Sequence, residues 1–434
     1  MVSFRSMLGK IRITALPNGC RVVTSAMPGV DSFSICFDAG TGGRFERPAE
    51  GGFSHFLEHM LFKGSRKRPT TKALSQPLER VGGQFNAYTS AEHTCFYAQV
   101  PADAAALAAD VLGDMFAHPL FDQSEIDRER QVVLEEIKMY HDDPASHAAD
   151  LSLAGLWPRH PLGRPVLGTP RTLAAADHDA LAAYHRRRYT ARGTIVAAAG
   201  KLEHERVVDL VHPFAEALPA GPAPSCAPAS RAPAPAPLVA DPRETQQVQA
   251  VVSFRSFGRT DPRRSAATVL THVLGGGLTS RLFMSVRERH GLAYSISAGH
   301  QSFRDTGAFQ VYAGLDAARA GKGLALVARE LRAVAEKGLG RREFADARSA
   351  LAGMQRLGGE TSQSQMSWIL SKLRWFGRVE TPDEVVTRLR AVKADEVQAL
   401  ARDLFRPENL SLSLVLPREG AGTPESLLAA VRGG

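Results

Sequence analysis

The sequence lacks paired cysteines. Four cysteines occur among 434 residues, and no two of them have the spacing of a CxxC motif. Neither a disulfide framework nor a cysteine-based metal site is therefore expected. The four positions are Cys20, Cys36, Cys95 and Cys226.

The sequence also lacks a long apolar run and a cluster of like charges. No stretch is long and apolar enough to predict a membrane span, and residues 1–10 lack the apolar core of a signal peptide. This start is slightly basic and could be a weak targeting segment for the mitochondrial matrix. Location in a bacterial cytoplasm is the simpler expectation. The net charge of +8 comes from scattered arginines, so no nucleic-acid partner is expected.

The length of the chain indicates more than one domain, because 434 residues exceed the size of a single compact core. A proline- and alanine-rich stretch interrupts the periodic segments near the middle of the chain. We therefore predict a domain at 1–218, a linker at 219–240 and a second domain at 241–434.

The two halves resemble each other in the order of their expected elements, which predicts a duplicated α+β unit. The first half contains a hairpin with an Asn18-Gly19 turn. Further strands are expected at 34–40, 94–100, 194–200, 247–254, 293–298 and 308–315. Helices are expected at 103–116, 266–274, 280–289, 317–336, 341–356 and 383–404.

The most informative motif is His55-Phe56-Leu57-Glu58-His59. Positions i and i+4 share one face of a helix, so both imidazoles can reach one metal ion. Glu58 then lies beside the metal without ligating it, which suits a general base acting on water. The order reverses the H-E-x-x-H motif of many zinc proteases and matches the inverzincin signature.

The residues around this motif favour a metal site over two surface histidines. By helical periodicity, the apolar side chains of the segment gather on one face and the polar motif residues, with Phe62, on the other. One face can pack on a core while the other faces a cavity. The apolar residues are Phe53, Phe56, Leu57, Met60 and Leu61.

A catalytic zinc ion needs about three protein ligands, so a carboxylate on another helix is expected. In the helical segment 121–140, Glu129 and Glu136 lie two turns apart at one edge of the apolar stripe, while Glu135 points away. This geometry selects Glu136 as ligand and makes Glu129 a supporting carboxylate. The alternative is that both glutamates form surface ion pairs with neighbouring arginines, and for this segment alone that alternative is preferred.

Together, these features resemble the pitrilysin/insulinase family of zinc peptidases, and in particular the β-subunit of the mitochondrial processing peptidase and its bacterial relatives. The resemblance spans most of the chain and includes the segments 82–89, 160–163 with Gly168, and 275–283. It implies one Zn²⁺ per chain, bound by His55, His59 and Glu136. It further implies that Glu58 is the catalytic base and that Glu129 supports the site.

The resemblance also implies an α+β fold. Two homologous domains are expected, each a mainly antiparallel β-sheet with helices packed on one side. The Pro/Ala-rich linker would join the two domains. The second half contains no inverted zinc motif.

Residues that bind substrate are implied by the same resemblance. Asn86 and Ala87 would bind the substrate backbone at a sheet edge, where an extended peptide can add as a strand. Arg287 and Tyr294 match the family's pair that binds substrate and stabilises the developing oxyanion. Because two chains close the chamber in half-length members, we expect this pair to serve the zinc site of a partner subunit.

One departure from the family pattern concerns substrate choice. Presequence-processing members carry two acidic residues, ten and fourteen positions after the glutamate ligand, which help to recognise a substrate arginine. Here these positions hold Ser146 and Asp150. With Asp150 as the single carboxylate, cleavage of a broader range of peptides or unfolded segments is expected.

The sequence thus predicts a zinc endopeptidase acting on peptides or unfolded segments, in a homodimer or in a heterodimer with a related chain. The competing hypothesis is a catalytically silent subunit that binds peptide or serves as a scaffold. Such subunits lose zinc residues, whereas this chain keeps them together with Arg287 and Tyr294. A structural zinc site is disfavoured because it normally has four protein ligands.

Overall fold

The computed structural model describes residues 8–229 and 237–433, which form two compact units. Neither unit is continuous in sequence. The first consists of Met1–Ile137, Pro165–Ala227 and Gln355–Glu384, and the second of Lys138–Arg164, Pro228–Met354 and Val385–Gly434. The predicted division at 219–240 stays a prediction: 219–229 contain neither helix nor strand, 230–236 lie outside the described residues, and a strand begins at Leu238.

The first unit is built on a six-stranded sheet with the order β1-β2-β6-β3-β5-β4. Within the described residues, neighbouring strands are antiparallel except for the parallel pair β2 and β6. The strands are β1 (Lys10–Ala15), β2 (Arg21–Ala26), β3 (Ser32–Ala39), β4 (Gln84–Thr89), β5 (Thr94–Pro101) and β6 (Thr194–Gly200).

The second unit contains a five-stranded sheet with the order β7-β11-β8-β10-β9, in which β7 and β11 form the parallel pair. This order repeats β2-β6-β3-β5-β4 of the first sheet, strand for strand in chain order. The repeat agrees with the predicted duplication, and the predicted α+β fold is confirmed. The strands are β7 (Leu238–Arg243), β8 (Gln247–Phe257), β9 (Ala293–Ser302), β10 (Thr306–Asp316) and β11 (Leu410–Pro417).

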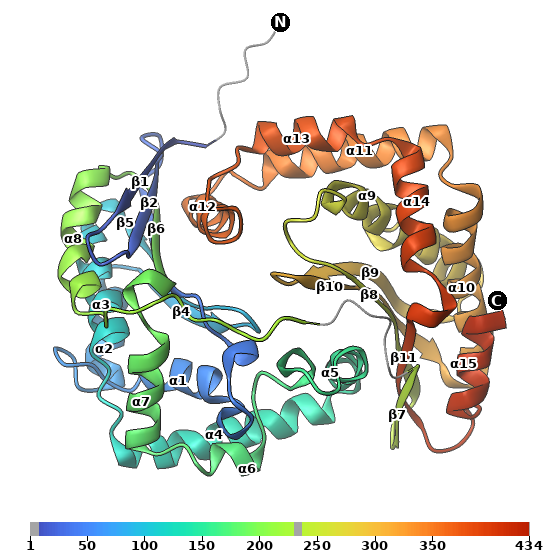
Figure 1. Cartoon of the computed structure of the whole chain (residues 1–434), viewed down its shortest axis with the longest axis horizontal. Coiled ribbons are helices and arrows are strands. Elements are labelled where there is room, and N and C mark those ends of the chain that lie inside the picture. The colour runs from blue at the N-terminus through green and yellow to red at the C-terminus, as the bar shows by residue number, and fades with distance from the viewer. Residues whose placement is uncertain (1–7, 230–236, 434) are drawn as a thin grey trace, which may run out of the picture. The chain divides into compact units, whose positions relative to one another are not determined.

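Most helices of the first unit pack on one face of its sheet. Phe37 of β3 and Phe96 of β5 contribute to a core with the apolar faces of the helices, whereas Cys36 and Ile195 point to the opposite face, as strand alternation requires. That opposite face is covered by α12 (Ser362–Phe376), as Figure 1 shows. The other helices are α1 (Phe53–Leu61), α2 (Thr71–Arg80), α3 (Ala105–Ala117), α4 (Gln123–Asp142), α6 (Pro170–Leu173), α7 (His178–Arg188) and α8 (His204–Glu216).

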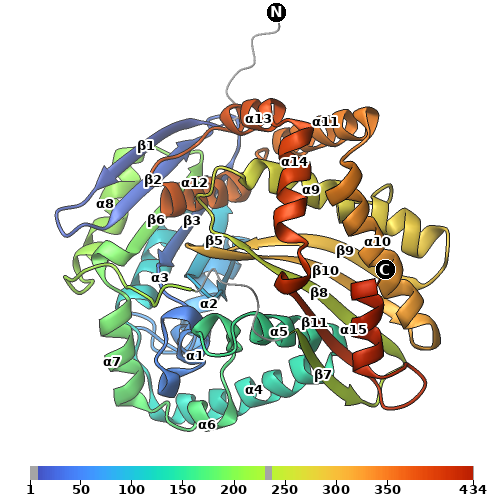
Figure 2. The same cartoon turned by 45° about the vertical axis from the view of Figure 1, so that its right-hand side comes forward.

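The second sheet is covered in the same way. Figure 2 shows α10, α14 and α15 along one side of it, and α5 (Pro144–Leu156) packs on the other side through Ala148, Val251 and Val415. Each sheet therefore has one additional helix that comes from the other half of the sequence. The helices of this unit also include α9 (Arg264–Gly275), α10 (Ala320–Lys337), α14 (Ala394–Leu404) and α15 (Pro424–Gly433).

The prediction of a single helix at 383–404 is wrong. The structure has two helices there, α13 (Pro382–Ala391) and α14. Lys393 adopts an extended conformation, and its backbone N–H donates to Glu396 Oε2 at 2.8 Å. This capping interaction starts a new helix and ends the previous one. Earlier in the chain, α11 (Arg341–Leu357) matches the expected segment 341–356, whereas α12 between α11 and α13 was not expected. Among the described residues, no helix is long and apolar enough to cross a membrane.

Candidate metal centre

Helix α1 places the histidines of the motif, and its start is fixed by local backbone chemistry. Gly52 precedes the helix with φ of 90°, and a Cβ atom there would lie 2.5 Å from the carbonyl oxygen of Leu167. Glu46 accepts hydrogen bonds from the backbone N–H groups of Gly52 and Ser54, at 2.8 and 2.7 Å. A carboxylate at this end of a helix satisfies free N–H groups and is favoured by the helix dipole.

The two faces of α1 divide as the sequence predicts. Its apolar side chains are at most 3% exposed. Because they pack in the core, the polar face of the helix is turned toward α4 and β4. The apolar residues are Phe53, Phe56, Leu57, Met60 and Leu61.

Three side chains converge on one point at this polar face. The Nε2 atoms of His55 and His59 are 3.2 Å apart, and each lies 3.5 Å from Glu136 Oε2. Ligand atoms of a tetrahedral zinc ion lie roughly 3.3–3.6 Å from one another, given bonds of about 2.0–2.2 Å. The spacing therefore suits one such ion without rearrangement.

The donor set also fits zinc in its chemistry. Two imidazoles and one carboxylate are ligands of catalytic zinc sites, which keep a fourth position for water. Glu136 Oε2 is buried and accepts no hydrogen bond among the described residues. A buried anionic oxygen needs a nearby cation, which is either the protonated His59, whose Nε2 lies 3.5 Å away, or a bound metal ion. The neighbouring Glu135 is exposed, so the structure separates the two glutamates as predicted.

The protonation of the two histidines differs. Burial lowers the pKa of His55 to about 4, and the nearby His59 adds to this effect. Burial also acts to lower the pKa of His59, but contacts with Glu129 and Glu136 outweigh it and raise the pKa to about 9. Metal binding at this site would therefore release a proton from His59.

Glu129 lies behind His59, as expected for a supporting residue. Its Oε1 atom is 2.8 Å from His59 Nδ1, and its Oε2 atom is 2.5 Å from Lys63 Nζ. Burial acts to raise the pKa of Glu129, but hydrogen bonds with these two partners and their charges outweigh it and lower the pKa. A carboxylate at Nδ1 fixes the tautomer and the ring orientation of a histidine that ligates through Nε2.

Glu58 projects from the same face of α1 toward strand β4. Its Oε2 atom accepts a hydrogen bond of 2.5 Å from the hydroxyl of Thr89. Burial raises the pKa of Glu58 despite this hydrogen bond. A carboxylate whose pKa moves toward neutrality is a better general base at neutral pH.

Asn86 and Ala87 lie on β4, which forms the end of the first sheet beside β5. Side chains of β4 alternate between exposed and half-buried positions, and Asn86 is among the exposed ones. Thr89, on the same strand, contacts Glu58. The structure thus places the predicted substrate strand next to the predicted base.

Arg287 and Tyr294 belong to the second unit, where they lie together. The guanidinium carbon of Arg287 is 5.7 Å from the ring centroid of Tyr294, and Tyr294 is 76% exposed. Asp150 and Ser146 lie in α5 of the same unit, and Asp150 is exposed. The three converging side chains of His55, His59 and Glu136 belong to the first unit.

Sequence reasoning missed three features of potential site chemistry. Thr89 lies in the resembling segment 82–89 but was given no role, and Lys63, four residues after His59, was not considered part of the site. A second His/Asp group, formed by His141, His147 and Asp241, lies in the second unit. There a guanidinium nitrogen of Arg243 lies 2.9 Å from His141 Nε2 and 2.5 Å from Asp241 Oδ2. Because this cationic nitrogen contacts both groups, the cluster is explained without a metal ion.

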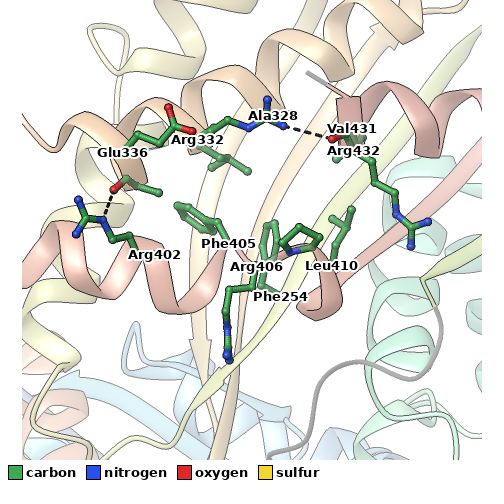
Figure 3. A pocket seen from close by; sticks show the side chains of 13 residues that line it. Phe254, Ala328, Arg332, Glu336, Arg402, Phe405, Arg406, Leu410, Val431 and Arg432 are labelled. Carbon is green, nitrogen blue, oxygen red and sulfur yellow. Dashed lines mark hydrogen bonds between the residues drawn. The ribbon is translucent and has the colours of Figure 1, made fainter.

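A cavity of about 330 Å³ in the second unit is shown in Figure 3. Its lining includes apolar side chains such as Phe254 and Leu331 and the exposed side chains of Arg402 and Arg406. Of the described residues that line it, none is a predicted site residue. The cavity is therefore separate from the candidate metal site formed by His55, His59 and Glu136.

Comparisons with protein families and with curated proteins identify the family of the chain. Residues 21–170 match the model of insulinase (peptidase family M16), and residues 175–351 match that of the peptidase M16 inactive domain. An uncharacterised zinc protease of Streptomyces coelicolor is 39% identical over 94% of this chain and 90% of its own length. One of Bacillus subtilis is 35% identical over 92% of this chain and 97% of its own.

Solved structures show the same fold at low sequence identity. The peptidase M16 inactive domain from Pseudomonas fluorescens has a TM-score of 0.88 at 18% identity, covering 95% of this chain and all of that chain. A protease from Helicobacter pylori has a TM-score of 0.87 at 17% identity, covering 94% of this chain and all of its own. From the family match and the close full-length relatives, the chain belongs to the insulinase family of peptidases, family M16.

Proposed function

We propose that this protein is a zinc-dependent endopeptidase that cleaves peptides or unfolded segments. The observation that carries the proposal is the convergence of His55 Nε2, His59 Nε2 and Glu136 Oε2 within 3.5 Å of one another. These atoms would hold one Zn²⁺ per chain. The ion supplies Lewis acidity, which makes water a better nucleophile and polarises the peptide carbonyl. The names of the full-length relatives as zinc proteases support the same metal.

Proton transfer is assigned to Glu58. It takes the proton of the attacking water and then donates it to the leaving amine. Its burial and its hydrogen bond with Thr89 hold the carboxylate in one orientation. Cleavage of a quenched fluorescent peptide of about 10–20 residues, long enough to add as a strand, tests the proposal.

Substrate binding is assigned to the edge strand β4. An extended peptide paired with β4 would gain main-chain hydrogen bonds that do not depend on its sequence. Asn86 and Ala87 would contact it, next to Thr89 and Glu58. The single carboxylate at Asp150 favours a broad choice of substrate over strict recognition of an arginine.

Replacement of Thr89 by valine is expected to lower kcat about ten- to hundredfold with little change in KM, because a hydrogen bond to a charged group contributes roughly 1.5–3 kcal/mol. Valine preserves the shape and the strand preference of the position. Steady-state kinetics and zinc content are measured for Thr89→Val and for Thr89→Ser, which keeps the hydroxyl. Equal kcat for Thr89→Val and wild type would show that Thr89 does not orient the base.

Arg287 and Tyr294 are assigned to oxyanion stabilisation at the zinc site of a partner subunit in a homodimer. A guanidinium and a phenol are suitable donors for that charge, and the two groups lie side by side with Tyr294 exposed. The presence of both residue sets in one chain favours a homodimer over specialised subunits. A heterodimer with a related chain and a catalytically silent role are the alternatives, and location in a bacterial cytoplasm stays a prediction.

Co-expression of two inactive variants tests this assignment. Glu58→Gln lacks the base, and Arg287→Ala/Tyr294→Phe lacks the donors. If the donors act in trans, each mixed dimer contains one complete site of two, so isolated mixed dimers are expected to have about half of wild-type activity and the unsorted mixture from random pairing about a quarter. The two chains carry different affinity tags so that mixed dimers can be isolated. Mixed dimers as inactive as the parents would exclude the trans arrangement.

A further inference from the structure

Lys63 continues a line of contacts that begins at the predicted metal ligand His59. Glu129 Oε1 is 2.8 Å from His59 Nδ1, and Lys63 Nζ is 2.5 Å from Glu129 Oε2. Glu129 is therefore held at both oxygens, by two residues of the same helix end. Lys63 follows His59 by four positions and lies in the turn directly after α1, and both side chains reach Glu129.

The local backbone fixes the position of Lys63. Helix α1 ends at Leu61, and the backbone N–H of Lys63 still donates to the carbonyl of Met60 at 3.0 Å. The Cα atom of Lys63 therefore lies in a defined turn directly after the helix. This turn places a long, flexible side chain within reach of α4, where Glu129 lies.

Burial makes the ion pair more than a surface contact. The side chain of Glu129 is 8% exposed and that of Lys63 is 25% exposed. Exposed pairs contribute little, whereas removing one partner of a buried pair leaves a charge without compensation. Without the ammonium group, Oε2 of Glu129 would lose this charged contact, and the carboxylate would be free to turn away from His59.

We propose that Lys63 is a positioning residue that acts through Glu129 to hold the imidazole of His59 in the orientation in which Nε2 faces His55 and Glu136. The proposal rests on the zinc site of the proposed function and adds a residue to its support. The hydrogen bond at Nδ1 sets the tautomer and the ring plane of a ligating histidine, and outer residues that provide it strengthen metal binding. Lys63 holds the carboxylate of Glu129 in place, and this carboxylate in turn orients the imidazole ring of His59.

The rate of zinc release tests the proposal independently of peptide cleavage. Zinc-loaded protein is mixed with a colorimetric chelator, and release is followed for wild type, Lys63→Met and Lys63→Arg. Lys63→Met is expected to release zinc about tenfold faster, the lower end of the roughly 10–100-fold effect of outer residues on metal affinity. Lys63→Arg keeps the charge and is expected to stay within about threefold of wild type by the same principle.

Lys67→Met is the matched control. Lys67 lies four positions further along the chain, and its Nζ atom is 2.5 Å from Asp110 Oδ1. The side chain of Lys67 is 52% exposed. Its removal also deletes a lysine–carboxylate pair, but not one that contacts a predicted ligand, so wild-type release is expected. Release from Lys63→Met at the wild-type rate, or equal acceleration in Lys67→Met, would overturn the proposal.

A double-mutant cycle shows whether Lys63 acts through Glu129. In a Glu129→Gln background, Lys63→Met is expected to add no further acceleration, because the carboxylate that it orients is gone. Full additivity of the two changes would overturn the proposed route. If wild type itself binds no zinc, the proposed function fails. If wild type binds zinc and Lys63→Met releases it at the same rate, only the role of Lys63 fails.

Discussion

Glu58→Gln is expected to abolish peptide cleavage while the protein still binds zinc. Glutamine has the same shape and can accept the hydrogen bond from Thr89, but it cannot take a proton from water. Glu58 is not one of the three residues that converge as metal ligands, so the ligand set stays complete in the Glu58→Gln variant. A loss of at least about 10³-fold in kcat is expected, within the roughly 10²–10⁴-fold range of general acid–base catalysis.

The measurement compares initial rates on a quenched peptide, with metal analysis of the same samples. Glu79→Gln serves as the matched control, since Glu79 is an exposed residue of α2 and its change should leave the rate unaltered. Zinc retained with less than a thousandth of the activity would match the role assigned to Glu58, in line with the magnitude of such catalysis. A variant with zinc and nearly full activity would remove Glu58 from the mechanism.

Glu136→Gln is expected to lose zinc, whereas Glu135→Gln should bind it as wild type does. Glu136 Oε2 lies 3.5 Å from the Nε2 atoms of both histidines, and Glu135 is exposed on another side of the same helix. A neutral amide is a poor ligand for Zn²⁺ in place of a carboxylate. Affinity should therefore fall by more than the roughly 10–100-fold caused by changes in outer residues.

Competition with a chelator of known affinity measures this effect. The two variants differ by one position and carry the same chemical change, so an unspecific effect on folding would affect both. Thermal unfolding of the zinc-free proteins checks that both remain folded. Equal zinc affinity of Glu136→Gln and wild type would show that Glu136 is not a ligand and that the cluster is misassigned.

Periodicity predicted which side chains share a helix face at the candidate centre, whereas the choice of Glu136 as a ligand over a surface ion pair came from the family resemblance. The i, i+4 spacing of His55 and His59 and the edge position of Glu136 depend only on helix geometry, and the structure places these atoms within 3.5 Å of one another. Glu129 also lies where the pattern of its helix indicated. The predicted placement on helix faces agrees with the structure because it depends on regular helices whose apolar faces must be buried, while the roles of these residues stay predictions.

Contacts between distant segments could not be predicted in the same way. The packing of α12 on the first sheet and of α5 on the second depends on which apolar faces meet, and helical periodicity does not identify the partner. Thr89 and Lys63 were missed for a related reason. Each is an ordinary residue in sequence and gains its role from a carboxylate on another element.

The break at Lys393 was missed because a local cap overrode a continuous pattern. Apolar residues follow a helical period from 383 to 404, and neither proline nor glycine marks the break. The extended backbone at Lys393 and its hydrogen bond with Glu396 appear only in the structure. A lysine is an unusual residue at a helix start, so standard start signals do not identify it.

The most direct test of the account is cleavage of a quenched peptide by purified wild-type protein of known zinc content. We expect one zinc per chain, cleavage within the peptide, loss of activity on removal of zinc by a chelator, and recovery when zinc is restored. Fully zinc-loaded protein that cleaves none of a varied set of peptides of about 10–20 residues would contradict it. That result would indicate a peptide-binding subunit instead of an endopeptidase.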